Sequence, residues 1–261
     1  MKTTNWYTTQ LQAGLGLLEE TRTLLELWEP GMDRNALYRK ALDSAAFPNV
    51  TARRLQNVVT EGFAPRYLAD EGRPAAMLKR LVGRVPTATW RQILFLFSAR
   101  AHPILYDFVQ TVYWPRRAEG HSVLRKEDAR RFIVQANQEG KTRRPWSEST
   151  IRRLSNYLTG CCADFGLLRE SRKADREFAS FRMEPQTALF LAYDLHFSGY
   201  GDTAAAAHSD WRLFGLEGYA VVETMKRLAY QGHWIVQSGA DLVKIGWVYT
   251  DREALADAII G

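Results

Sequence analysis

The chain has 261 residues, of which 46% are hydrophobic, 12% aromatic and 25% charged, a composition that fits a globular protein and excludes a disordered one. Thirty-five Lys and Arg against 29 Asp and Glu give a net charge of +6, which favours polyanionic partners. No apolar run approaches the roughly 20 residues of a membrane-spanning helix, and the N-terminus lacks the apolar segment of a signal peptide. We therefore expect a cytoplasmic protein without a membrane span.

The first part of the chain has the pattern of successive amphipathic helices. The first is predicted from apolar residues at spacings of four, three, seven and three: Leu11, Leu15, Leu18, Leu25 and Trp28. Asp33 and Thr51 are typical N-cap residues and should open the second and third helices. Further helices are expected after Pro74, Thr87 and Pro103. Because the linkers are short, these helices predict a compact bundle.

Basic residues are concentrated between residues 116 and 176. This segment holds fifteen Lys and Arg against eight Asp and Glu, a net charge of +7, whereas the whole chain carries +6. Such clustering indicates a polyanion-binding surface more strongly than the total charge does. The alternative is an ordinary solvated charged surface.

Within that segment, the pattern predicts a winged-helix-like order of helix, strand, basic loop and strand. Ser147 is a plausible N-cap and Gly166 a plausible C-cap of one helix. The buried stripe of this helix should consist of residues spaced by three and four: Ile151, Leu154, Leu158, Cys161 and Phe165. Strands are predicted at Leu167–Arg169 and Phe178–Met183, joined by a loop over residues 171–176 that would form the wing.

A helix of this kind fits the major groove of duplex DNA, where Arg and Asn side chains suit guanine and adenine edges. Arg and Lys of the wing suit phosphates. The predicted nucleic-acid contacts are Lys141, Arg143, Arg144, Ser149, Arg152, Arg153, Asn156, Arg172, Lys173 and Arg176. The competing interpretation is a plain amphipathic helix beside a hairpin, with a solvated charged face.

The C-terminal part is predicted to be helical and then strand-like. Helices are expected at Ala188–Phe197 and Leu216–Tyr230, followed by a hairpin of Trp234–Val236 and Leu242–Tyr249 and a short helix, Glu253–Ile260, capped by Asp251. This second helix and hairpin is less basic, so we interpret it as packing, or as a second winged-helix-like unit for protein contacts. The predicted organisation is a helical bundle over 1–115 and a basic α+β region over 116–261, or one packed body.

No pattern in the sequence indicates catalysis. The five histidines, His102, His121, His196, His208 and His233, lack metal-ligand spacing, and no phosphate-binding loop or nucleophile elbow occurs. The adjacent Cys161 and Cys162 suit buried core positions and neither a disulfide framework nor a zinc site. The Gly14-Leu15-Gly16 pair lies in a predicted helix without a preceding strand. We expect a protein that is not an enzyme and needs no metal or cofactor.

Three segments, in order and spacing, resemble a known family. They are Gly14-Leu15-Gly16-Leu17-Leu18-Glu19-Glu20-Thr21-Arg22, then His102-Pro103-Ile104-Leu105-Tyr106-Asp107-Phe108, and then Trp146-Ser147-Glu148-Ser149-Thr150-Ile151 leading into Asp164-Phe165-Gly166-Leu167-Leu168. Together they resemble BrxA, a small helical component of BREX bacteriophage-defence systems, over most of the chain. None of these motifs is a catalytic signature.

The resemblance implies that the N-terminal bundle is similar to the antitermination factor NusB, an RNA-binding fold. It implies membership of a multi-protein system that methylates host DNA and blocks phage replication, with DNA binding as the contribution of this component. Double-stranded DNA is therefore the expected partner, and other BREX components are possible partners. Two alternatives remain: RNA binding through the NusB-like bundle, and an assembly adaptor that bridges larger defence proteins without binding nucleic acid.

Overall fold

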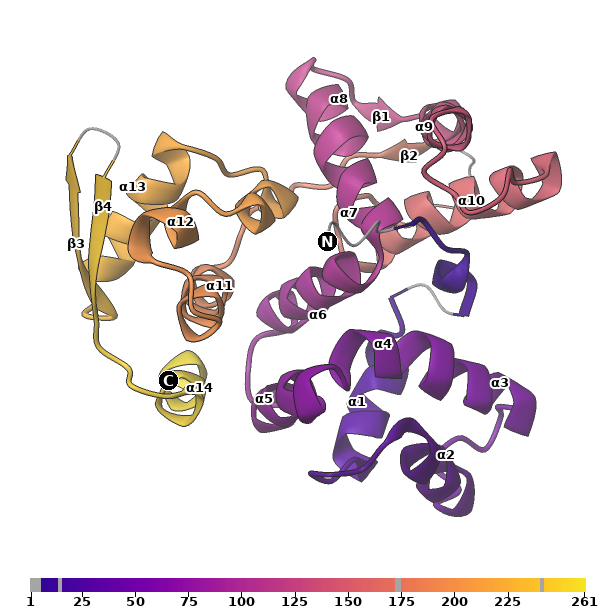
Figure 1. Ribbon diagram of the computed structural model, residues 1–261, viewed down its shortest axis with the longest axis horizontal. Helices are drawn as coiled ribbons and strands as arrows, with labels where there is room; N and C mark the ends of the chain where they lie inside the picture. Colours follow the sequence, from indigo (N-terminus) through magenta and orange to yellow (C-terminus); the bar gives the residue numbers. More distant parts are fainter. Residues whose placement is uncertain (1–5, 14–15, 172–174, 240–241) are drawn as a thin grey trace. The chain divides into compact units, whose positions relative to one another are not determined.

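The structure is a computed structural model, which describes residues 6–13, 16–171, 175–239 and 242–261. It is mainly helical, as predicted (Figure 1). The chain divides into two compact units. Unit 1 comprises Met1–Lys79 and Leu94–Phe181, and unit 2 comprises Arg80–Ile93 and Arg182–Gly261. The predicted boundary between residues 115 and 116 lies inside unit 1, and the division into 1–115 and 116–261 stays a prediction.

The N-terminal part of the chain consists of short helices. They are η1 (Gln10–Ala13), α1 (Leu18–Leu27), α2 (Arg34–Asp43), α3 (Ala52–Asn57), η2 (Val58–Phe63, a π-helical segment), α4 (Ala64–Tyr67), η3 (Asp70–Gly72) and α5 (Arg73–Leu81). The predicted caps are confirmed. The Asp33 carboxylate accepts hydrogen bonds from the N–H groups of Asn35 and Ala36, and the Thr51 hydroxyl accepts one from Arg54.

The prediction of one continuous helix from Leu11 to Trp28 is wrong. The 3₁₀ turn η1 is separate from α1, and Leu17 before α1 has a left-handed backbone with φ 49°. The Gly16 N–H donates to Asp164 Oδ2 at 2.7 Å, so a residue far along the chain fixes the chain direction here. Leu15, which belongs to the apolar pattern that predicted the helix, lies outside the described residues, as does Gly14.

A glycine allows the η3 turn to pack against Trp28, the residue that follows α1. Gly72 has φ +77°, and a Cβ atom there would lie 2.7 Å from Cζ2 of Trp28. The Trp28 side chain is almost fully buried, and its indole N–H donates to the carbonyl of Met32. Both the backbone conformation and the close contact therefore require glycine at this position.

The second half of unit 1 contains the basic segment. Its elements, with the helix that precedes them, are α6 (Thr87–Ala101), α7 (Pro103–Phe108), η4 (Val109–Tyr113, π-helical), α8 (Trp114–Ala118), β1 (Val123–Leu124), α9 (Lys126–Gln138), α10 (Glu148–Asp164) and β2 (Arg176–Glu177). The predicted helix after Ser147 is confirmed, because all five stripe residues from Ile151 to Phe165 are buried. Gly166 has φ 80°, as expected of a residue that ends a helix.

A small antiparallel sheet follows α10. Strand β1 pairs with β2, and Leu168 forms a bridge with Phe178 on the other side of the β2 segment. The strand predicted at Phe178–Met183 is wrong: β2 ends at Glu177, and only Phe178 pairs beyond it. From Phe178 on, the side chains pack against aromatic rings instead, and the Phe178 ring lies 5.1 Å from the Tyr113 ring.

Unit 2 contains α11 (Pro185–Phe197), α12 (Asp202–Ala206), η5 (Ser209–Phe214), α13 (Tyr219–Ala229), β3 (Trp234–Gly239), β4 (Leu242–Trp247) and α14 (Arg252–Ile260). The predicted hairpin is confirmed, with Trp234 opposite Trp247. The predicted cap of the last helix is also confirmed, since Asp251 accepts hydrogen bonds from the N–H groups of Glu253 and Ala254.

Candidate nucleic-acid interface

One face of α10 carries polar and basic side chains that are exposed to solvent, although the Ser149 hydroxyl also shares a hydrogen bond with the Ser147 hydroxyl at 3.0 Å. Ser149, Arg152, Arg153 and Asn156 are all exposed, opposite the buried stripe, as the spacing predicted. We call these four residues the α10 face. In the part of the chain that the structure describes, no ion pair or side-chain hydrogen bond engages Arg152 or Arg153.

The segment between α9 and α10, residues 141–146, carries two more free guanidinium groups. We call it the arginine loop. Arg143 and Arg144 are exposed, and neither has an ion-pair partner among the described residues. Lys141 is also exposed, but its ammonium group pairs with Glu139 at 3.2 Å. The arginine loop leads directly into the N-terminus of α10, so the four free arginines belong to two consecutive segments.

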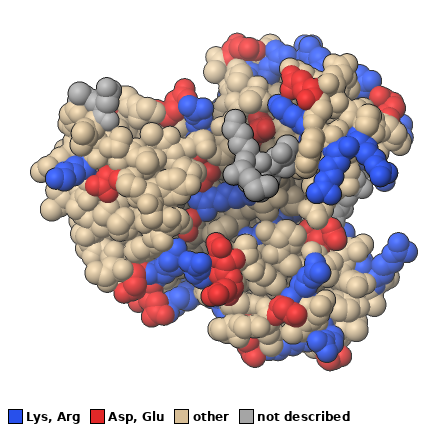
Figure 2. Space-filling model, viewed as in Figure 1, with Lys and Arg blue, Asp and Glu red and all other residues tan. Residues whose placement is uncertain are grey.

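Many other basic residues of this segment are neutralised by neighbours. Arg130 pairs with Glu148 at 3.1 Å and with Glu127 at 3.2 Å, and these two hydrogen bonds raise its pKa. Arg169 pairs with Glu177. In Figure 2, acidic side chains are interspersed among the Lys and Arg over the region where Figure 1 draws α8, α9 and α10. The net positive charge is therefore available mainly at residues without such partners.

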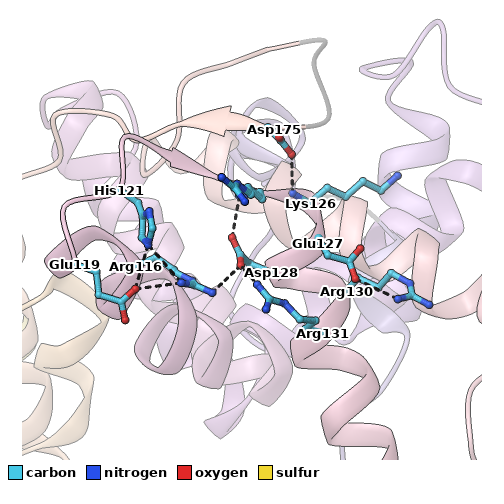
Figure 3. Close-up of polar contacts among 10 residues, drawn as sticks. Arg116, Glu119, His121, Lys126, Glu127, Asp128, Arg130, Arg131 and Asp175 are labelled. Carbon is cyan, nitrogen blue, oxygen red and sulfur yellow. Dashed lines mark hydrogen bonds and ion pairs between the residues drawn. The ribbon is translucent and has the colours of Figure 1, made fainter.

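Asp128 is the centre of an ionic cluster at the start of α9 (Figure 3). Its buried carboxylate accepts from Arg131 Nη2 at 2.6 Å, from Arg116 Nη2 at 3.0 Å and from the Arg125 N–H at 3.1 Å. Arg116 also pairs with the exposed Glu119. The cluster joins α8 to the first turn of α9, and thereby orients the helix that precedes the arginine loop.

We expect Asp128→Ala to lower the free energy of unfolding by about 2 kcal/mol, because it removes an N-terminal cap acceptor and leaves Arg116 without its buried partner. The ion pair between Asp128 and Arg131 contributes little to this loss of stability, since the Arg131 side chain is 61% exposed. Urea unfolding of the purified wild-type and variant proteins measures the change in the free energy of unfolding. Glu119→Ala, which removes the exposed partner of Arg116, should change stability by less than about 0.5 kcal/mol. Equal losses in both variants would contradict the role assigned to Asp128.

The predicted wing residues are placed only in part. Arg172 and Lys173 lie outside the described residues. Arg176 lies in β2, opposite Leu124, and is half-buried. Burial raises the pKa of the Cys162 thiol, and the nearby charge of Arg176 opposes this rise. Contact of Arg172, Lys173 and Arg176 with nucleic acid stays a prediction.

Sequence reasoning missed two residues that hold the arginine loop, Asn137 and Tyr7. Asn137 Oδ1 accepts from the Trp146 N–H at 2.9 Å and from the Thr142 hydroxyl at 3.0 Å. The Tyr7 N–H donates to the Lys141 carbonyl at 2.9 Å. A polar residue near the end of a helix and an aromatic residue near the N-terminus carry no distinctive signal in one sequence, so no pattern could have identified them.

The charge also differs between the units. Unit 1 contains 26 of the 35 Lys and Arg and 19 of the 29 Asp and Glu, a net charge of +7, whereas unit 2 carries −1.

Among the described residues, no group of three or more His, Cys, Asp or Glu side chains is arranged to hold a metal ion. None of the helices in the described ranges combines the length and apolar character that crossing a membrane requires.

Comparison with known proteins identifies the family. The family model of BrxA matches residues 5–194, nearly three quarters of the chain. The chain belongs to the BrxA family. The resemblance found in the sequence is thereby confirmed, and membership of the BrxA family makes the protein a BREX phage-defence component. No curated protein gives a significant match.

A solved structure shares the fold of this BrxA-family protein. It is the crystal structure of an uncharacterized protein from Magnetospirillum magneticum, which matches with a TM-score of 0.58 and 17% sequence identity. The match covers 80% of this chain and 97% of that chain. At this identity, the likeness shows a common fold and carries no information about function.

Proposed function

We propose that this BrxA-family protein is a non-enzymatic, cytoplasmic DNA-binding component of a BREX system. The arginine loop and the α10 face would contact duplex DNA. The observation that carries the proposal is a contrast among the described residues. Arg143, Arg144, Arg152 and Arg153 are exposed and have no ion pair with any of these residues, whereas neighbours such as Arg130 are paired. Unpaired arginines on one helix and the preceding loop suit phosphates and base edges.

The order of elements supports the same proposal. The elements follow one another in the order α8, β1, α9, α10, the paired residue Leu168 and β2. In the sheet, the β2 segment lies between β1 and Leu168. This is the order of a winged helix, in which the second helix of a helix-turn-helix enters the major groove. In this arrangement α10 would be the recognition helix, and the wing predicted over residues 171–176 would follow it, although Arg172 and Lys173 lie outside the described residues.

A specific observation favours the adaptor as second candidate. Several large apolar side chains of unit 2 are exposed on or beside α13 and the hairpin: Tyr219, Tyr230, Ile235, Leu242 and Val248. Exposed aromatic and aliphatic side chains are typical of protein-binding surfaces. An adaptor would use this region and would leave the arginines of unit 1 solvated.

Fluorescence anisotropy with labelled duplex DNA, duplex RNA and single strands, each over a salt series, separates these functions. Each phosphate contact contributes a slope of about −0.9 to a plot of log affinity against log salt. Four free arginines therefore predict a slope between about −3 and −4 for duplex DNA. Tighter binding of RNA would favour the NusB-like bundle as the binding surface. Weak, unsaturable association with every probe would favour the adaptor and contradict DNA binding.

A further inference from the structure

The arginine loop is closed by one side chain. Asn137, in the last turn of α9, binds both ends of the loop: its Oδ1 accepts from the Thr142 hydroxyl at 3.0 Å and from the Trp146 N–H at 2.9 Å. Its Nδ2 donates to the Trp146 carbonyl at 3.3 Å. Thr142 is buried and Asn137 is half-buried, so their hydrogen bond is partly shielded from water. These three hydrogen bonds surround Arg143 and Arg144 and engage neither of them.

The N-terminal segment holds the same loop from another direction. The Tyr7 N–H donates to the Lys141 carbonyl at 2.9 Å, and Tyr7 forms a parallel bridge with Thr142. The Tyr7 ring lies 5.9 Å from the Lys141 ammonium, and its hydroxyl donates to Asp107 Oδ2 at 2.5 Å. Asp107 belongs to α7, so Tyr7 ties the loop to a helix of unit 1. Tyr7 itself is buried.

The backbone of the loop is further restricted at both ends. Gly140, with φ 69°, ends α9, and the Lys141 N–H bonds back to the Ala136 carbonyl. Pro145 limits the backbone of the preceding Arg144 to extended conformations. The two exposed guanidinium groups are therefore carried by a short segment whose backbone is fixed on both sides.

We propose that Asn137 is a positioning residue for nucleic-acid binding, which holds the arginine loop so that Arg143 and Arg144 meet phosphates without first being ordered, with Tyr7 as the second anchor. This inference rests on the proposed DNA-binding function. Asn137 touches no nucleic acid in this arrangement and acts only through the two arginines. A preordered loop binds more tightly because ordering side chains and loops on binding opposes association.

A double-mutant cycle measures this role. Asn137→Ala is made in the full-length protein and again in the Arg143→Ala, Arg144→Ala background, and affinity for labelled duplex DNA is measured at fixed salt. In the otherwise wild-type protein we expect about a five- to tenfold loss, which corresponds to the cost of fixing the backbone of about one loop residue on binding. In the background without the two arginines, the further loss should be less than about twofold, because coupled residues show non-additive effects.

Controls separate positioning from folding. Asn57→Ala changes an exposed asparagine of α3 and should leave affinity unchanged. If Asn137→Ala does not fold, Thr142→Val removes one of the three bonds and should give a smaller loss with the same dependence on the arginines. Equal losses in both backgrounds, or none in either, would overturn the positioning role while DNA binding stands. A wild-type protein that binds no duplex would overturn the proposed function, and this role with it.

Discussion

Reversing two charges on the α10 face, with Arg152→Glu and Arg153→Glu, is expected to weaken duplex-DNA binding by about 60-fold or more at 0.1 M salt. Two phosphate contacts contribute about 1.8 to the slope of log affinity against log salt, which amounts to about 60-fold between 1 M and 0.1 M. The reversed charges add repulsion to that loss. Anisotropy over a salt series should also show a slope that is less steep by about 2.

A matched variant controls for the change in net charge. Arg34 and Arg53 are exposed arginines of unit 1, at the start of α2 and in α3, without ion pairs among the described residues. Arg34→Glu with Arg53→Glu alters the net charge equally and should reduce affinity only by the weak long-range effect that salt screens. Equal affinities of the two double variants would place the binding surface elsewhere, provided that both melt like the wild type.

The second large effect concerns stability. Gly72→Ala should lower the free energy of unfolding by about 3 kcal/mol, of which the left-handed backbone accounts for about 1–2 kcal/mol and overpacking against Trp28 for the rest. The added Cβ would meet an aromatic ring that is almost fully buried and cannot move aside without disturbing its neighbours. Chemical denaturation monitored by tryptophan fluorescence measures the loss.

Gly31→Ala supplies the comparison for this variant. Gly31 also has a left-handed backbone, with φ +85°, but a Cβ there would meet no atom within 4 Å. It should therefore lose only the backbone contribution of about 1–2 kcal/mol. The difference between the two variants isolates the contact with Trp28. Identical losses would show that the indole ring does not constrain position 72.

Features that depend on neighbouring residues could be predicted from the sequence. The N-caps were predicted because a capping side chain bonds to backbone N–H groups only two or three residues further along the chain. They are Asp33, Thr51, Ser147 and Asp251. The buried stripe of α10, and therefore the exposure of its basic face, followed from helical spacing in the same way. Residue spacing alone was thus sufficient to locate the α10 face.

Features that depend on distant partners could not be predicted. The break before α1 depends on the bond between Gly16 and Asp164, two residues separated by most of unit 1 in sequence. The end of β2 depends on aromatic packing of Phe178 against Tyr113. Periodicity carries no information about either contact, so the apolar pattern alone indicated a longer helix and a longer strand.

Which basic residues are ion-paired likewise depends on distant partners and could not be predicted from the sequence. Composition placed fifteen basic residues between 116 and 176, but only the fold distinguishes Arg130, which pairs with Glu127 and Glu148, from Arg152, which has no partner in the described ranges. A count of charges therefore overstates how many can bind a polyanion. Ion pairing within the fold selects the arginine loop and the α10 face from the larger set.

The π-helical segment η4 sets the rotational phase of α8. Its hydrogen bonds span five residues, as in the bond from the Trp114 N–H to the Val109 carbonyl, so it contains one residue more than a regular α-helical turn. Each residue of an α-helix turns the chain by about 100°. If the same residues were wound as a regular α-helix, α8 would be rotated by about 100° and Arg116 would be carried away from Asp128, so the wide turn absorbs the extra residue and keeps α8 in its present phase. Val109 and Tyr113 of this segment are buried, and the Tyr113 hydroxyl donates to the Leu167 carbonyl at 2.8 Å, so substitutions in related sequences should be confined mainly to the other three positions.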